Sequence, residues 1–372
     1  MIKVLHIIKS LGRGGAEMLL PETIAIHNKA QYEFHTIYFL PWKNQMVQAI
    51  KDNGGKVTCL PAKNNVKIIL SVTDVAKYVR EHKIDIIHCH LPWAGIAGRL
   101  AGKMTGVPVI YTEHNKWERY HKFTYSLNKF TFGWQQLVVP VSGDVEQSIR
   151  HHYTNPSLQI QTILNGVNTE KFDRSLPVAV DIRAQLGIAA ATKVIGTVSV
   201  FRVQKRLLTW LEIAHQVHQQ HPDTYFIVVG DGPLKEEVHA KAKELKMDGY
   251  LHFAGLQEEV RPYFKAMDVF MMASEFEGLP IALLEAMSME CIPCCTKAGG
   301  IAEVIEDNKS GVLVDVQQPM ALTEKLSYLI QNWDTIAPAM KKNAREKVKS
   351  NFSMQRMVAE LEAVYTKLAR KN

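Results

Sequence analysis

The sequence predicts an α/β protein with two doubly wound, Rossmann-like domains, each built on a parallel sheet. Short, nearly continuous apolar runs alternate with helical or polar stretches along all 372 residues. Such runs are typical of strands that are buried on both faces of a parallel sheet. The runs form two series, one in each half of the chain, and a chain of this length is long enough for two or three domains.

Each series contains six predicted strands. In the first half they lie at residues 2–8, 34–40, 56–60, 84–90, 108–114 and 136–142. In the second half they lie at residues 193–201, 224–230, 250–255, 268–274, 291–296 and 311–314. Between the two series, residues 168–191 contain Pro177 and only a weak apolar pattern, which predicts a linker region.

Composition and charge narrow the class of protein. With 47% hydrophobic and 22% charged residues, the chain resembles an ordinary globular protein. No apolar run approaches the roughly 20 residues that span a bilayer, and the N-terminus lacks a signal-peptide cleavage site, so we expect a cytoplasmic location. Residues 1–175 contain 21 Lys and Arg against 13 Asp and Glu, a formal charge of +8, whereas the remainder carries −1. A basic first half could meet nucleic acid, an anionic membrane or a phosphorylated substrate, or be a solvated face.

The five cysteines are expected to be reduced, since their number is odd and no secretion signal precedes them. Cys291 and Cys294 have C-x-x-C spacing, but no second pair completes a zinc site. The same stretch has the pattern of a short apolar strand, and we favour that interpretation.

Polar and glycine residues follow nearly every predicted strand. Ligands of doubly wound sheets bind beyond the carboxyl ends of the strands, so these residues are the first candidates for a site. They are Gly12 to Gly15, His90, His114, Ser142, Asn165, Arg202, Gly230 to Pro233 and Glu277.

The glycine loop after the first strand contains Gly12, Gly14 and Gly15. It allows either a close approach of a ligand to the backbone or a tight turn. Its spacing is not G-x-G-x-x-G and no acidic residue ends the second strand, which disfavours dinucleotide binding. In the second half, Arg202 and Lys205, with Arg206 beside them, form either a diphosphate clamp at a helix start or a solvated basic turn.

His90 and His114 each end an apolar strand and could donate hydrogen bonds to a substrate or a phosphate, but a structural histidine with satisfied hydrogen bonds is the preferred interpretation. Because they belong to different βα units without carboxylates at ligand spacing, metal binding is not expected. Between Trp117 and Trp134, apolar residues recur at helical spacing, flanked by lysines. The stripe could contact a membrane surface or a lipid-linked substrate, but an inward-packed face of a domain helix is the preferred interpretation.

The stretch SEFEGLPIALLE places two acids around a predicted helix start. Pro280 suits the first helical turn, which puts Glu277 on the preceding loop and Glu285 about one and a half turns inside the helix. Because a helix N-terminus attracts anions, two carboxylates around it are electrostatically unfavourable and need a functional or structural reason.

Together these residues resemble the family-4 retaining glycosyltransferases, and the resemblance covers nearly the whole chain. The most specific match is SEFEGLPIALLEAM followed by AGGIAEVI; GGAE, TEH, VSGD, ILNGVN and GDGP accompany it. The resemblance implies the GT-B architecture, with parallel sheets facing a central cleft. It implies an acceptor domain at 1–170, a nucleotide-sugar domain at 171–355 and a last helix at 356–372 that crosses back.

The resemblance also implies roles for individual residues. Glu285 would hydrogen-bond the ribose of a nucleotide, and Glu277 would contact the transferred sugar. Arg202 and Lys205 would hold the diphosphate, and His114 would lie beside the sugar. The remaining donor contacts would come from Gly14, Gly15, Leu256, Gly278, Leu279, Pro280 and Ile281. No cofactor or metal is expected, because cations and helix-start N–H groups can stabilise the leaving diphosphate.

The implied function is retaining transfer of a sugar from a nucleotide diphosphate, such as a UDP-sugar, in cell-envelope polysaccharide or lipid-linked glycan assembly. The expected partners are the donor, a glycan or lipid-linked acceptor and an anionic membrane surface at the inner face, but not nucleic acid. A sugar-nucleotide epimerase of the same fold and a non-catalytic nucleotide-sugar-binding protein are the alternatives.

Two departures from the family pattern stand out. Lys205 follows Arg202 by three residues where many relatives have five, so Arg206 could share the role of Lys205. Glu290 stands where a glycine is usual, which predicts a different local turn.

Overall fold

The computed structural model describes residues 1–370, which divide into two compact units. The first unit comprises residues 1–165 and the segment that begins at Met354, and the second comprises Gly166–Ser353. The predicted boundary at 170 therefore lies five residues later than the observed one, and the predicted return at 356 lies two residues later. Residues 371–372 of the predicted last helix lie outside the described residues.

The first unit contains a six-stranded sheet in the order β3-β2-β1-β4-β5-β6. All of its neighbouring strands pair in parallel. The chain reverses its direction of winding between β1 and β4, which is the switch point where doubly wound sheets bind ligands. The strands are β1 (Ile2–Ile8), β2 (Tyr32–Tyr38), β3 (Lys56–Cys59), β4 (Ile86–His90), β5 (Val109–Glu113) and β6 (Leu137–Pro140).

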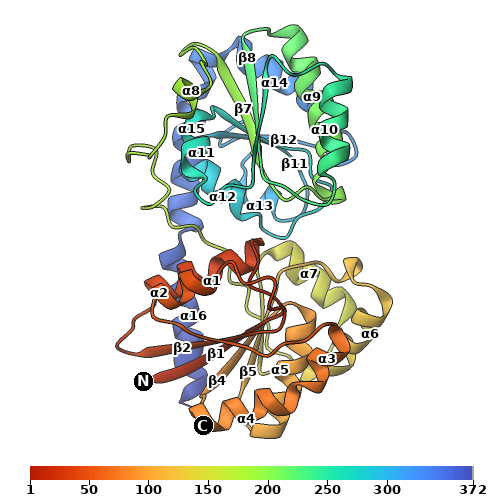
Figure 1. The fold of residues 1–372 in the computed structure, drawn as a ribbon, viewed down its shortest axis with the longest axis vertical. Coiled ribbons are helices and arrows are strands. Elements are labelled where there is room, and N and C mark those ends of the chain that lie inside the picture. Colours follow the sequence, from red (N-terminus) through yellow and green to blue (C-terminus); the bar gives the residue numbers. More distant parts are fainter. Residues whose placement is uncertain (371–372) are drawn as a thin grey trace. The chain divides into compact units, whose positions relative to one another are not determined.

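Helices cover both faces of this sheet (Figure 1). The C-terminal helix α16 (Met354–Ala369) packs against β1, β4 and α1 (Gly15–Ile26), although it follows them by more than 250 residues. The remaining helices and 3-10 turns are α2 (Val47–Asp52), α3 (Asn65–Leu70), α4 (Val72–His82), α5 (Pro92–Thr105), η1 (Trp117–Arg119), α6 (Lys122–Thr131), η2 (Phe132–Trp134) and α7 (Gly143–His152).

The second unit repeats this topology with a sheet in the order β12-β11-β10-β7-β8-β9, again with parallel neighbours. Its switch point lies between β7 and β10. The strands are β7 (Lys193–Val198), β8 (Thr224–Val229), β9 (Leu251–Gly255), β10 (Val269–Met272), β11 (Ile292–Thr296) and β12 (Val312–Val314). All twelve strands lie where the apolar runs predicted them, and the predicted α/β fold of two Rossmann-like domains is confirmed.

The helices and 3-10 turn of the second unit follow the same alternation. They are α8 (Ile182–Gln185), η3 (Val203–Lys205), α9 (Leu207–Gln220), α10 (Lys235–Glu244), α11 (Arg261–Ala266), α12 (Ile281–Ser288), α13 (Ile301–Val304), α14 (Ala321–Gln331) and α15 (Trp333–Asn351). Among the described residues, no helix combines the length and the apolar character needed to span a bilayer.

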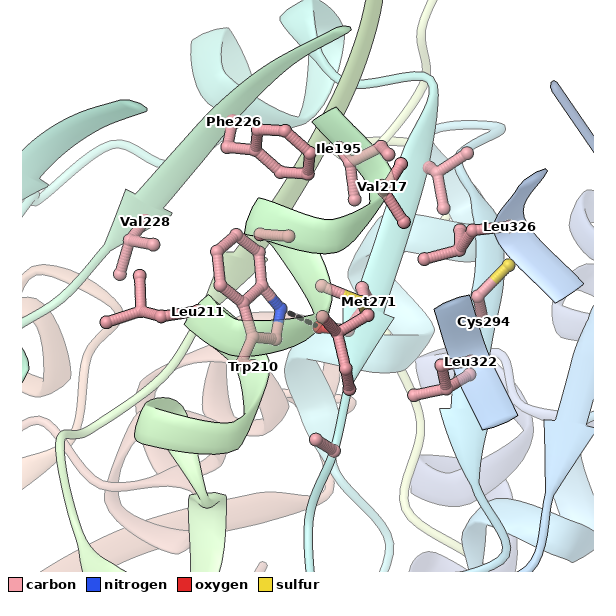
Figure 2. Packing of buried hydrophobic residues seen from close by; sticks show 14 of the residues in the cluster. Ile195, Trp210, Leu211, Val217, Phe226, Val228, Met271, Cys294, Leu322 and Leu326 are labelled. Carbon is pink, nitrogen blue, oxygen red and sulfur yellow. Dashed lines mark hydrogen bonds between the residues drawn. The ribbon is translucent and has the colours of Figure 1, made fainter. Parts of the chain in front are cut away.

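The core of the second unit fills the space between its sheet and helices α9 and α14 (Figure 2). Trp210 of α9 is buried there, and its indole N–H donates to the carbonyl of Met271 on β10 at 3.0 Å. Cys294 belongs to the same cluster. Cys291 and Cys295 are also buried, and burial raises the pKa of all three thiols. This agrees with the strand interpretation of the C-x-x-C stretch.

The predicted linker at 168–191 is instead part of the second unit. The guanidinium of Arg174 donates to four backbone carbonyls, at Phe264, Lys265, Met267 and Met289, at 2.8–3.3 Å. Arg183 pairs with Asp268 at 2.5 Å. These two arginines attach a segment with few apolar residues, so its weak apolar pattern was a misleading indication of a linker.

The preference for an inward aromatic face on α6 was also wrong. Phe123 and Phe130 are 62% and 72% exposed, whereas Asn128 and Thr131 are buried. The reason is Arg99 of α5, which is fully buried and donates to the side-chain oxygens of Asn128 at 2.6 Å and Gln135 at 2.9 Å. A buried guanidinium must be hydrogen-bonded, so the polar side of α6 faces inward and its aromatic side faces outward.

Candidate active site

At the switch point of the second unit, the loops after β7 and β10 meet. The backbone N–H of Glu275 donates to the carbonyl of Gln204 at 2.8 Å, which ties the two loops together. The first loop carries Arg202 and Lys205, and the second carries Glu277. Two predicted site segments that are about seventy residues apart therefore lie side by side.

The two loops also share an ion pair. Lys205 Nζ lies 2.6 Å from Glu277 Oε1, and the two side chains are only 18% and 10% exposed. Arg202 is exposed, and its side chain has no hydrogen bond or ion pair within residues 1–370. The site thus contains one cation held by a carboxylate and one cation open to a ligand.

Arg206, which was considered as a substitute for Lys205, has a different position. Its backbone is left-handed, with φ of 47°, and it immediately precedes α9. Its guanidinium donates to the carbonyl of Val316 at 2.7 Å and lies 3.8 Å from Glu275. Arg206 therefore links the site loop to the chain beyond β12.

The loop from Glu277 leads directly into α12. Pro280 immediately precedes the helix, which begins at Ile281, one residue later than the first-turn position expected for the proline. The Gly278 carbonyl accepts from the Gly300 N–H at 2.9 Å, which joins this loop to the AGG turn after β11. The N–H groups of Leu283 and Leu284 donate to the Pro280 carbonyl at 3.2 and 3.4 Å, so those of Ile281 and Ala282 are the natural contacts for an anion at this helix start.

Glu285 and Leu256 complete the predicted set in this unit. Glu285 lies inside α12, as predicted, and is 6% exposed. Leu256 directly follows β9 and is 60% exposed, a large apolar side chain open to a partner.

The GDGP turn packs against the loop that carries Arg202, a contact that the sequence alone did not indicate. Gly230 has φ of +127°, and a side chain on it would collide with the backbone of Ser199. A side chain on Gly232 would meet the backbone of Phe201. The Phe201 N–H donates to the Asp231 carbonyl at 3.0 Å. The turn therefore packs directly against the backbone that leads into Arg202.

In the first unit, Gly14 precedes α1, and Gly15 is its first residue. The carboxylate of Glu17 occupies the space that a side chain on Gly14 would need, and it accepts from Ser10 Oγ at 3.1 Å. The sequence allowed either a tight turn or a ligand contact at this loop. A contact between these glycines and a donor stays a prediction.

His114 lies one residue beyond β5 and is partly exposed. Its Nε2 atom lies 3.3 Å from Nδ1 of His90 at the end of β4. Burial lowers the pKa of His114 to about 4, so its imidazole is neutral at pH 7. The two strand-end histidines thus lie together, although they come from different βα units.

Glu113 is a site residue that the sequence analysis missed. It is fully buried beside His114, and five groups donate to its carboxylate: the backbone N–H groups of His114 and Asn115, the Tyr111 and Tyr120 hydroxyls and the Trp117 indole, at 2.5–3.2 Å. Burial raises the pKa of Glu113 to about 7, against the effect of these donors. An acid inside the TEH stretch, at the end of an apolar strand, was the available indication.

Three buried histidines belong to neighbouring strands of the same sheet, His6 to β1 and His88 and His90 to β4. Ring nitrogens of His6, His88 and His90 lie within 4.8 Å of one another. However, both nitrogens of His88 have partners at 2.7 Å, the hydroxyls of Tyr365 and Thr112. A metal ion bound by all three would have to displace one of these hydroxyls. The expected absence of a metal stays a prediction.

Family models match both units of the chain. The model described as glycosyltransferase family 4 matches residues 14–171, and the one described as glycosyl transferases group 1 matches residues 179–347. The chain belongs to the group 1, family 4 glycosyltransferases. Its two sheets are those of the GT-B fold.

Individual glycosyltransferases extend this result. The chain is 27% identical to UDP-Gal:alpha-D-GlcNAc-diphosphoundecaprenol alpha-1,3-galactosyltransferase of Escherichia coli, over 81% of this chain and 80% of the relative. It is 27% identical to N-acetyl-alpha-D-glucosaminyl L-malate synthase of Bacillus anthracis, over 80% and 78%. The structure of Anabaena HepE in complex with UDP-glucose matches with a TM-score of 0.86 at 20% identity, over 99% of this chain and 100% of HepE.

The structure of this glycosyltransferase brings part of the predicted set together. Lys205 and Glu277 are in contact, and hydrogen bonds join their loops and the Gly278 turn to neighbouring segments. The other predicted residues, Gly14, Gly15 and His114, belong to the first unit. The roles that the resemblance implies for all of these residues stay predictions.

Proposed function

We propose that this glycosyltransferase transfers a sugar, with retention of its anomeric configuration, from a UDP-sugar to a lipid-linked or glycan acceptor. We place the reaction in the assembly of bacterial cell-envelope polysaccharide or glycolipid. The observation that carries the proposal is the ion pair of Lys205 and Glu277 beside the open start of α12. It offers a cation, a carboxylate and helix-start N–H groups at the switch point, where such sheets bind ligands.

The chemistry needs these groups. The bond between the sugar C1 and the diphosphate oxygen breaks, and its electron pair leaves with the diphosphate. The acceptor oxygen bonds to C1 on the same face, and its proton passes to a diphosphate oxygen. Arg202, Lys205 and the α12 N–H groups stabilise the developing negative charge. These groups already supply positive charge, so the proposal includes no metal ion.

The carboxylates would recognise the two ends of the donor. Glu277 would accept hydrogen bonds from hydroxyls of the transferred sugar, and Glu285 from the ribose, while exposed Leu256 would contact the base. The UDP donor is supported by HepE, whose structures are described in complex with UDP and UDP-glucose. A lipid-diphosphate acceptor is supported by the Escherichia coli relative, whose name specifies a diphosphoundecaprenol substrate.

A donor panel tests the proposal. The purified chain is incubated with UDP-, GDP- and ADP-sugars, with and without polyprenyl-diphosphate acceptors, in excess EDTA. We expect transfer from a UDP-sugar that survives EDTA and yields the anomer of the donor by proton NMR. Arg202→Ala and Glu285→Ala should reduce transfer; full activity in both would overturn the site assignment. A new sugar nucleotide without acceptor would indicate an epimerase, and binding without turnover a non-catalytic protein.

We also propose that α6 contacts an anionic membrane that holds the acceptor. Its outward face presents Phe123 and Phe130, and the exposed Lys122 and Lys129 flank them. An amphipathic helix with aromatic and basic residues binds in the plane of a membrane interface. The basic charge of the first half of the chain would add electrostatic attraction to anionic lipids.

A further inference from the structure

Three imidazoles of the first unit form one hydrogen-bonded chain. His6 on β1 lies with Nδ1 at 2.9 Å from Nε2 of His90 on β4. His90 in turn lies with Nδ1 at 3.3 Å from Nε2 of His114. The Nδ1 atom of His114, at the partly exposed end, has no partner within residues 1–370. This series of three histidines, here called the histidine chain, therefore runs from the buried His6 to the partly exposed His114, which a ligand can reach.

All three imidazoles are neutral at pH 7. His6 and His90 are 2% and 7% exposed, and burial lowers the pKa of His6 to about 3, of His114 to about 4 and of His90 well below its usual value. A neutral imidazole has one N–H donor and one bare nitrogen acceptor. In a chain of neutral rings, each hydrogen bond therefore dictates the tautomer of the next ring.

Only two arrangements satisfy both hydrogen bonds. In one, every ring carries its proton on Nδ1, so His6 donates to His90 and His90 donates to His114. In the other, every proton is on Nε2 and the donors run in the opposite direction. The two arrangements present opposite groups at His114 Nδ1, an N–H donor in the first and a bare acceptor in the second.

The buried end of the chain favours the first arrangement. Nε2 of His6 is buried and has no hydrogen-bond partner among the described residues. The ring of Phe34 lies stacked beside His6, with an interplanar angle of 24°, so its face does not accept an in-plane N–H. A buried N–H without an acceptor is rarer in proteins than an acceptor without a donor. The bare nitrogen of His6 therefore belongs at Nε2.

We infer that His6 and His90 are positioning residues that hold His114 in its Nδ1–H tautomer, so that the first unit presents an N–H donor to its ligand. That this ligand is the donor sugar, whose oxygens accept hydrogen bonds, rests on the proposed function. The tautomer itself does not. His88 lies on β4 with His90 but does not belong to the histidine chain, since both of its ring nitrogens bond to hydroxyls.

Nitrogen-15 NMR of the full chain with labelled histidine tests the inference directly. At neutral pH, the two ring nitrogens of His114, assigned by comparison with His114→Gln, report its tautomer. We expect an excess of about tenfold of the Nδ1–H form, the size of bias that follows from avoiding an unsatisfied buried N–H. A predominant Nε2–H form, or a near-equal mixture, in the parent protein would overturn the inference.

Two substitutions test whether His90 sets the tautomer. His90→Phe removes the donor to His114 Nε2, and the tautomer ratio should fall toward unity. His88→Gln changes a histidine of β4 outside the histidine chain, and the ratio should stay as in the parent. An unchanged ratio in His90→Phe would contradict the positioning role. If the parent shows the expected tautomer but no UDP-sugar is turned over, the proposed function fails while this inference stands.

Discussion

Lys205 Nζ lies 2.6 Å from Glu277 Oε1, and this ion pair joins the two loops that meet at the switch point of the second sheet. Both side chains are largely shielded from water, so solvent screens their attraction less than in an exposed salt bridge. The Glu277 carboxylate is already paired with the Lys205 ammonium in this structure. A diphosphate that binds here must therefore compete with Glu277 for Lys205, whereas Arg202 is open from the start.

Lys205→Met should weaken UDP binding about ten- to hundredfold, because a hydrogen bond to a charged group contributes roughly 1.5–3 kcal/mol. Arg206→Met is the matched control, since Arg206 binds the Val316 carbonyl. It should lower the free energy of unfolding by about 1 kcal/mol and leave UDP affinity within about threefold of the parent. Isothermal calorimetry and urea denaturation separate the two effects. Equal losses of affinity in both variants would show that the two cations share the diphosphate.

Glu277→Gln should separate binding from transfer. The amide keeps the shape of the side chain but no longer competes for Lys205, so UDP should bind at least as tightly as to the parent. Sugar transfer should fall about tenfold or more, because the neutral amide is a weaker acceptor for sugar hydroxyls than the carboxylate. The comparison needs calorimetry with UDP and a transfer assay on the same preparation. If Glu277→Gln lost UDP affinity and sugar transfer to the same extent, Glu277 would not compete with the diphosphate for Lys205.

The buried histidines should make the first unit sensitive to acid. The pKa of His6 is about 3 in the folded chain, against about 6.5 when unfolded, so the unfolded state binds more protons between these values. Lowering the pH from about 7.5 to about 5 should reduce the free energy of unfolding by about 2 kcal/mol for His6 alone. Glu113, whose pKa is raised to about 7, opposes this trend because its protonation stabilises the fold as the pH falls. His27 acts in the same direction as His6, because burial lowers its pKa and the pair with Glu362 offsets only part of that effect.

Urea denaturation at both pH values, in the parent and in His6→Phe, isolates the contribution of His6. The variant should lose less stability on acidification by about 2 kcal/mol. His151→Phe replaces an exposed histidine and should keep the parent's pH dependence. If His6→Phe and His151→Phe show the same dependence, His6 does not remain neutral in the folded chain.

Replacing Phe123 and Phe130 by serine should weaken binding to anionic vesicles. Each exposed phenylalanine loses roughly 1.5–3 kcal/mol of apolar contact, so the partition coefficient should fall at least tenfold. Lys122→Gln together with Lys129→Gln should remove mainly the salt-sensitive part of the binding. Sedimentation with phosphatidylglycerol vesicles at low and high salt measures both. Val203→Ser, at an exposed valine of the second unit, is the control, and an equal effect there would argue against α6 as the contact.

Glu290→Gly should stabilise the second unit. Glu290 has φ of 60°, a left-handed backbone that favours glycine, and the difference from the turn of relatives stays a prediction. Relief of about 1–2 kcal/mol of strain, less about 0.5–1 kcal/mol for the greater freedom of glycine when unfolded, leaves a net gain of about 0.5–1 kcal/mol. Glu290→Ala removes the carboxylate near Arg345, as Glu290→Gly does, but keeps the backbone strain. The midpoint temperature of thermal unfolding should therefore be higher for the glycine variant than for the alanine variant.

The predictable part of the site lies where chemistry is local. Glu277 on a loop, Glu285 on a helix and the basic residues after β7 followed from the order of residue types along the chain. The roles of Glu113 and Arg99 could not be predicted from the order of residue types, because they depend on the burial of these side chains. Glu113 collects five donors. Arg99, buried under α6, reversed the expected orientation of that helix.

The sequence by itself determined the two α/β domains, the twelve strands and the family, because alternating apolar and polar stretches record local burial and a few motifs are specific. Only the tertiary structure decided which strand ends meet. The parallel order of the sheets brings Lys205 to Glu277 and joins His6, His90 and His114 into one chain. Such contacts depend on strands that are distant in sequence becoming neighbours, and no local pattern of residues encodes that pairing.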